Sequence, residues 1–175
     1  MAKTLTDDDM YQMIIDAIDE VTKEMGIKIA AQYLAEFGTR NSTNKNYIRT
    51  GNVYKAWLAS PGAYSDGHNS VGWDLFDINQ ITPKTTTPWY MFNSHRNWDN
   101  GDEWKGLYVP DMVPEWLNSG FTIVNVKGER FPFAGRKYAE QALGLSSLKN
   151  GALQKYIEEE AAKRIYKKLR QMGVV

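Results

Sequence analysis

The sequence predicts an α+β fold, with a small antiparallel β-sheet flanked by a long N-terminal helix and by C-terminal helices. Two observations lead to this prediction. Apolar residues recur at helical spacing near both ends of the chain, and the central part is rich in aromatic and β-branched residues that Gly, Pro, Asn and Asp interrupt. We treat residues 1–175 as one domain, because a single hydrophobic core can grow to this size, and residues 82–114 as a long aromatic-rich insertion.

The first expected element is an amphipathic helix that begins after Thr6. Thr6 is a favourable N-cap, and the aspartates that follow it suit the positive end of a helix dipole. One apolar stripe predicts the face that packs on a core: Met10, Ile14, Ala17, Ile18, Val21 and Met25. Gly26 is expected to break or bend this helix, and a second helical stretch is expected to end at Gly38.

The central part of the chain is expected to hold strands and loops. Residues 39–46 are polar without an apolar anchor, which predicts a mobile loop. Three runs bounded by turn residues predict strands: residues 53–60, 71–78 and 121–126.

The last expected elements are helices. A short helix is predicted over residues 136–143. A longer one is expected after Asn150 as its cap, with acidic residues early, basic residues late and Gly173 at its end. Its apolar face is predicted to consist of Leu153, Ile157, Ala161, Ile165 and Leu169.

The net charge is zero, yet the two ends of the chain carry opposite charge. Residues 1–25 hold seven acidic and two basic residues, whereas residues 127–175 hold eleven basic and five acidic residues. Two interpretations stay open. The terminal elements lie beside each other in one fold or show solvated faces, or the acidic face of one copy meets the basic face of the next, which closes a ring when the rotation permits.

Composition limits the classes of function. The chain has no cysteine, which excludes disulfides, thiolate metal sites and cysteine nucleophiles. The balanced charge argues against a protein whose main role is to wrap a polyanion. No stretch approaches the roughly 18–20 apolar residues of a membrane span, and the acidic N-terminus is unlike a secretory signal, so we expect a soluble protein without membrane contact. We expect that the protein is not an enzyme, that it has no catalytic or metal-binding residue and that it binds no cofactor.

Two histidines are the obvious candidates for acid–base or metal chemistry. His95 lies near Asp99, Asp102 and Glu103, but this spacing matches no metal signature, and His68 lies far away in a glycine-rich turn. We interpret the surroundings of His95 as a plain surface loop and turn. A hydrolase whose site the sequence does not advertise remains an alternative.

Tryptophan and tyrosine are abundant enough to suggest a carbohydrate-binding module, in which aromatic faces stack on sugar rings. The favoured interpretation divides the six tryptophans into two groups. The first group, expected in the core, is Trp57, Trp73 and Trp116. The second group, expected to pin the insertion to the body or to a neighbouring subunit, is Trp89, Trp98 and Trp104.

Three segments carry a family resemblance. Arg49-Thr50-Gly51 follows the acidic helix and a polar loop, residues 88–93 form an aromatic step, and residues 131–143 run from aromatic residues and glycine towards alanine and leucine. With a lysine-rich final helix, this order resembles the small tail-completion and neck (head–tail joining) proteins of tailed bacteriophages. In that family the Arg-Thr-Gly step leads from the first helix into the first strand.

The resemblance implies a structural virion protein that forms a homo-oligomeric ring of six or twelve copies at the head-proximal end of the tail. It implies as partners the head connector and the tail-terminator or tail-tube proteins, passive contact with DNA passing through the ring, and assembly in the host cytoplasm. We expect the insertion and the charged ends to form the contacts between subunits. The interface residues expected are Trp89, Tyr90, Trp98, Trp104 and Arg49.

Overall fold

The computed structural model describes residues 5–38, 52–67, 70–77, 80, 115–124 and 127–174. It confirms the α+β class, with helices and two separate two-stranded antiparallel sheets. The elements in chain order are α1 (Asp7–Tyr33), η1, a π-helical turn (Leu34–Gly38), α2 (Asn52–Leu58), β1 (Gly62–Ser65), β2 (Val71–Asp74), β3 (Gly120–Val124), β4 (Arg130–Ala134), α5 (Tyr138–Leu143) and α6 (Ala152–Gln171). Residues 115–119 are also helical.

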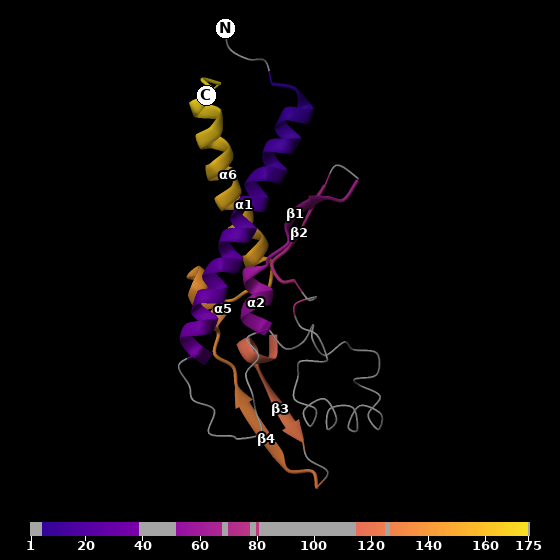
Figure 1. The fold of residues 1–175 in the computed structure, drawn as a ribbon, viewed down its shortest axis with the longest axis vertical. Helices are drawn as coiled ribbons and strands as arrows, with labels where there is room; N and C mark the ends of the chain where they lie inside the picture. Colours follow the sequence, from indigo (N-terminus) through magenta and orange to yellow (C-terminus); the bar gives the residue numbers. More distant parts are fainter. Residues whose placement is uncertain are drawn as a thin grey trace.

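Helix α1 is the axis of the molecule (Figure 1). It contacts α6, the β1–β2 hairpin, α2 and α5. Along its N-terminal half, α6 lies on one side and the hairpin on the other, and both chain termini lie at this end (Figure 1). The β3–β4 hairpin extends from the opposite end (Figure 1).

The start of α1 agrees with the sequence prediction. The Thr6 hydroxyl accepts a hydrogen bond from the backbone N–H of Asp9 at 3.1 Å, and the Asp9 carboxylate accepts one from the Thr6 backbone at 3.0 Å. This reciprocal pair is a capping box, which satisfies backbone donors that a helix N-terminus leaves open. The buried face of α1 consists of Met13, Ala17, Val21, Thr22, Met25, Gly26, Ile29 and Ala30.

The expected break at Gly26 was wrong, because α1 continues through this residue to Tyr33. The reason for a glycine is the neighbouring element: a Cβ here would lie 2.6 Å from the Trp57 carbonyl oxygen and 2.8 Å from the Ser60 Cβ. Gly26 thus lets the end of α2 approach the backbone of α1 closely, at a cost of about 1 kcal/mol in helix propensity.

Gly26→Ala is expected to destabilise the fold by about 1–2 kcal/mol in urea denaturation, although alanine is the better helix former. Overpacking costs about 1–3 kcal/mol, and the gain in propensity offsets about 1 kcal/mol of it. Ala31→Gly, at an exposed position of the same helix, is the control and should lose about 1 kcal/mol from propensity alone. A Gly26→Ala protein more stable than the parent would contradict the close approach.

The strand predicted over residues 53–60 was wrong, because the chain forms α2 there. Its β-branched and aromatic residues favour a strand locally, but the buried pair Ala56 and Trp57 packs against α1 as part of a short helix. The resemblance-based expectation that Arg-Thr-Gly leads into a strand is corrected in the same way, since the next described element is helical. Strand β1, which begins at Gly62, was not predicted.

The remaining strands match the predictions in part. Strand β2 starts at Val71 as expected but ends at Asp74, and β3 agrees closely with the expected run. Strand β4 was not predicted. In the first hairpin Tyr64 pairs with Gly72, and its ring covers the glycine, where a Cβ would clash.

An aromatic cluster forms the core at the C-terminal half of α1. The ring of Tyr138, which is fully buried, lies 5.4 Å from that of Tyr33, 5.9 Å from that of Phe37 and 6.3 Å from that of Trp57. The indole N–H of Trp57 donates a hydrogen bond to the Tyr138 hydroxyl at 3.3 Å. Burial raises the pKa of Tyr138 well above its usual value. The cluster ties α1, η1, α2 and α5 together.

Asn118 supplies the cap that α5 lacks locally. The N-cap residue of α5, Lys137, has a positive φ of 50° and makes no side-chain cap. Instead, the buried Asn118 side chain accepts a hydrogen bond from the Ala139 backbone N–H at 3.0 Å and donates one to Glu140 at 2.7 Å. The Asn118 carbonyl also accepts from the Lys137 backbone at 2.8 Å. The short helix is therefore fixed from a distant part of the chain.

Helix α6 begins later than expected. Gly151, with a φ of 77°, is the N-cap residue, so the predicted Asn150 cap was wrong. Gly173 has a φ of 70° just beyond the end of the helix, in agreement with its expected role.

Candidate functional site

The strongest polar constellation in the described chain is a charged seam between α1 and α6. Three acidic residues of α1, Asp16, Glu20 and Glu24, follow one another at intervals of four residues and face two basic residues of α6, Arg164 and Lys168. Residues four apart share a helix face, so each helix presents its charges to the other. The acidic N-terminal helix and the basic C-terminal helix therefore form ion pairs with each other within one molecule.

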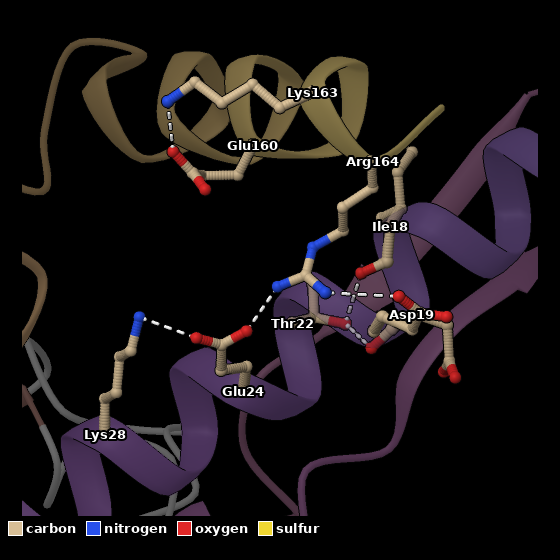
Figure 2. Close-up of polar contacts among 9 residues, drawn as sticks. Ile18, Asp19, Thr22, Glu24, Lys28, Glu160, Lys163 and Arg164 are labelled. Atoms are coloured by element: carbon tan, nitrogen blue, oxygen red, sulfur yellow. Dashed lines mark hydrogen bonds and ion pairs between the residues drawn. The ribbon is translucent and has the colours of Figure 1, made fainter. Parts of the chain in front are cut away.

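Arg164 is the centre of this seam, and Figure 2 shows it reaching from α6 towards the carboxylates of α1. Its Nη1 lies 3.1 Å from Glu20 Oε2, and its Nη2 binds Glu24. Lys28 adds an ion pair to Glu24 at 2.8 Å, and Lys168 lies 3.6 Å from Asp16. The Nε of Arg164 is buried and has no hydrogen-bond partner among the described residues, so the guanidinium contributes two of its three nitrogens.

The pKa values of the seam reflect these contacts. Hydrogen bonds from Lys28 and then Arg164 lower the pKa of Glu24. Burial disfavours the charged form of Arg164, but hydrogen bonds to Glu24 and Glu20 outweigh it and raise its pKa. Because the pKa of Glu24 is lower in the folded state, its contribution is present above about pH 4.5 and is lost as the pH falls through the folded value.

Thr22 is a buried polar residue of α1 that lies between the seam and the core. This residue is fully buried, and its hydroxyl donates to the backbone carbonyls of Ile18 at 2.9 Å and Asp19 at 3.1 Å, as Figure 2 shows. The hydroxyl is therefore satisfied within its own helix. Asp19 turns towards the other side of α1, where its carboxylate accepts from the Ala63 backbone of β1 at 3.1 Å and pairs with Lys23 at 2.9 Å.

Arg164→Met is expected to lower the free energy of unfolding by about 1 kcal/mol at low salt. The substitution keeps most of the buried stem but removes both ion pairs, whose carboxylates are about half exposed and therefore weakly coupled. The loss should shrink at high salt because partly exposed charges are screened. Lys155→Met is the control, since the ion pair of Lys155 with Glu159 lies within α6 at 3.8 Å. Equal losses for both variants would contradict a role for the seam in holding α1 to α6.

The five interface residues predicted from the sequence, Arg49, Trp89, Tyr90, Trp98 and Trp104, lie outside the described residues. His68, His95 and Asp99 lie outside them as well. The described residues contain no group of three His, Asp or Glu side chains that could hold a metal ion. In this part of the chain no helix is both long and apolar enough to cross a membrane.

The described tryptophans pack inside the chain. Trp57 is 9% exposed and belongs to the core, as predicted. Trp73 is half-buried against that core, and Trp116 is half-buried with its ring 5.7 Å from that of Phe121. These three side chains therefore do not form an exposed stacking platform.

Comparison of the chain with protein-family models, with curated proteins and with solved structures found no match.

The seam makes a structural contact between α1 and α6. Its carboxylates each face a cation, and it holds the two terminal helices in register. The sequence held a signal for it, because Asp16, Glu20 and Glu24 repeat at four-residue spacing, as do Arg164 and Lys168. What the sequence could not show is that these two faces belong to one molecule.

Proposed function

We propose that this chain is a structural virion protein of a tailed bacteriophage or of a phage-tail-like particle, which forms a ring at the head–tail junction. The observation that carries the proposal is the order of elements. An acidic N-terminal helix, antiparallel hairpins, a short alanine-containing helix and a basic final helix follow one another as the resemblance implies. The helix in place of the first strand is the departure from that order.

The packing of the elements on α1 supports a role as the repeating unit of a ring. Helix α1 contacts α6 and the first hairpin along its N-terminal half, and the seam fixes α6 against it. The hydroxyl of Tyr11 donates to the Ser70 carbonyl at 2.9 Å and lies 3.1 Å from the Ser65 hydroxyl, which holds the tip of the hairpin to α1. Because α6 and the first hairpin are both held to α1, the two sides of the molecule are suited to repeated contacts between neighbouring copies in a ring.

The experiment is localisation of the chain on purified particles. An antibody against the chain, applied to particles from the strain that encodes it, should label the head–tail junction in electron micrographs. Disruption of the reading frame should leave filled heads and tails that are not joined, and expression in trans should restore joined particles. Absence of the chain from purified particles, or label along the tail tube or at the distal end, would overturn the proposal.

A further inference from the structure

We propose that the outward face of α6 is a docking surface for a second copy of this chain, and that it receives the acidic side formed by the start of α1 and the tip of the first hairpin. The α6 surface consists of Lys163, Tyr166, Lys167 and Arg170, and the acidic side consists of Asp7, Asp8 and Asp66. The ring geometry of this contact rests on the proposed function, but the contact itself is testable without a particle.

The basic residues of α6 divide into two sets. Arg164 and Lys168 point to α1 and are neutralised by its carboxylates. Lys163, Lys167 and Arg170, at intervals of four and three residues, occupy the other side of the helix and are all exposed. Lys163 pairs with Glu160 at 2.6 Å, whereas Lys167 and Arg170 form no ion pair with the described residues.

An exposed aromatic residue lies within this basic surface. Tyr166 is 57% exposed and stands three residues after Lys163 and four before Arg170. Tyrosine is enriched at protein interfaces because its ring buries apolar area while its hydroxyl stays hydrogen-bonded. The combination provides charge for steering and one aromatic contact for affinity.

The acidic side lies across α1 from this surface. Asp8 stands three residues before Tyr11, which bonds the hairpin, so residue 8 shares the hairpin face of α1. Asp7 and Asp8 are exposed in the first turn, and Asp66, whose backbone and side chain hold the hairpin turn, is exposed at the tip. The seam does not use these three carboxylates.

The arrangement favours a head-to-tail contact. Figure 1 places α6 on one side of α1 and the hairpin on the other, at the same end of the molecule. A basic side and an acidic side that point in opposite directions cannot meet within one chain. They can meet between neighbouring copies in one orientation. Such heterologous contacts close into a ring where the rotation between copies permits, and extend into a filament where it does not.

Cysteine cross-linking tests the contact directly, because the chain contains no cysteine of its own. Asp8→Cys and Lys167→Cys chains are purified separately, checked for helix content by circular dichroism, mixed at high concentration and oxidised. We expect a cross-linked heterodimer several-fold more abundant than in a mixture of Asp8→Cys with Lys155→Cys. Lys155 is exposed on the same helix but about 18 Å nearer its start, from 12 residues at about 1.5 Å each. Equal or absent cross-linking in the two mixtures overturns the proposal.

Charge exchange provides a second test that does not depend on position 8 tolerating cysteine. Lys167→Glu/Arg170→Glu and Asp7→Lys/Asp8→Lys proteins should each self-associate several-fold more weakly than the parent in sedimentation at low salt. Their mixture should regain association, since the altered acidic face then meets the altered basic side. A mixture that stays as weak as its components overturns the proposal.

Two further outcomes separate this contact from other partners and from the proposed function. If Lys167→Glu/Arg170→Glu loses binding to a labelled DNA duplex while cross-linking at position 8 is absent, the surface binds a polyanion and the contact between copies is wrong. If antibody labels the head–tail junction but cross-linking fails, the proposed function stands and this contact falls.

Discussion

Replacement of Tyr138 by alanine is expected to lower the free energy of unfolding by about 3–5 kcal/mol, the range for truncation of a large buried aromatic side chain. Tyr138 is fully buried, and its ring contacts those of Tyr33, Phe37 and Trp57. Its removal would leave a cavity where α1, η1, α2 and α5 meet. Since small domains are stable by only about 5–15 kcal/mol, the variant should be largely unfolded in modest urea.

Tyr138→Phe is the matched control, because it keeps the ring and removes the hydroxyl. The variant loses the hydrogen bond from the Trp57 indole and should cost about 1 kcal/mol. The measurement is urea denaturation of both proteins, followed by far-ultraviolet circular dichroism. A Tyr138→Ala protein as stable as Tyr138→Phe would show that the ring does not hold the four elements together.

Alkaline stability should depend on the same residue. Burial raises the pKa of Tyr138 in the folded state, so the folded protein binds this proton more tightly than the unfolded chain does. The contribution of Tyr138 to the free energy of unfolding is therefore constant below about pH 10. Above that pH it falls by about 1.4 kcal/mol for each pH unit. Tyr138→Phe should show a shallower loss between pH 10 and pH 11.5, and an unchanged slope would contradict a buried, neutral phenol.

The helices could be predicted because their signals are local. Thr6 with the aspartates behind it marks the start of α1, and the apolar spacing of α6 marks its buried face. The strand prediction for residues 53–60 was wrong because Val53, Tyr54 and Trp57 favour strands locally. The packing of this segment on Gly26 of α1 instead favours the helix α2. That packing joins residues about thirty positions apart. Its one mark in the sequence of α1 is Gly26, which in a local reading indicates a helix break and not a contact.

The charged seam shows the same limit at the level of the candidate site. Charge counts identified opposite ends but left open whether they meet within a chain or between chains. The contact of Arg164 with Glu20 and Glu24 decides this for the inner faces of α1 and α6. Lys167 and Arg170 lie on the outer face of α6. A charge count cannot distinguish the outer face from the inner one, because the rotation of α6 about its axis decides which residues face α1.

Gly135→Ala is expected to destabilise the protein by about 3 kcal/mol, at the upper end for overpacking. A Cβ on Gly135 would lie well inside 3.0 Å of the Ser119 carbonyl carbon, the Asn118 carbonyl oxygen and the Gly120 nitrogen. All three are backbone atoms, which cannot turn away as a side chain can.

The same backbone carries the cap of α5, since the Asn118 carbonyl accepts from Lys137 and its side chain accepts from Ala139. A methyl group at position 135 would force residues 118–120 away from α5, so the cap and the packing of Tyr138 should weaken together. Gly128→Ala is the control: no atom lies within 4 Å of its Cβ position, and only its φ of 79° opposes alanine, at about 1–2 kcal/mol. Urea denaturation should therefore rank Gly135→Ala as the less stable variant. Equal stability of the two proteins would mean that residues 118–120 yield to the methyl group, and that the hydrogen bonds of Asn118 do not hold α5 rigidly in place.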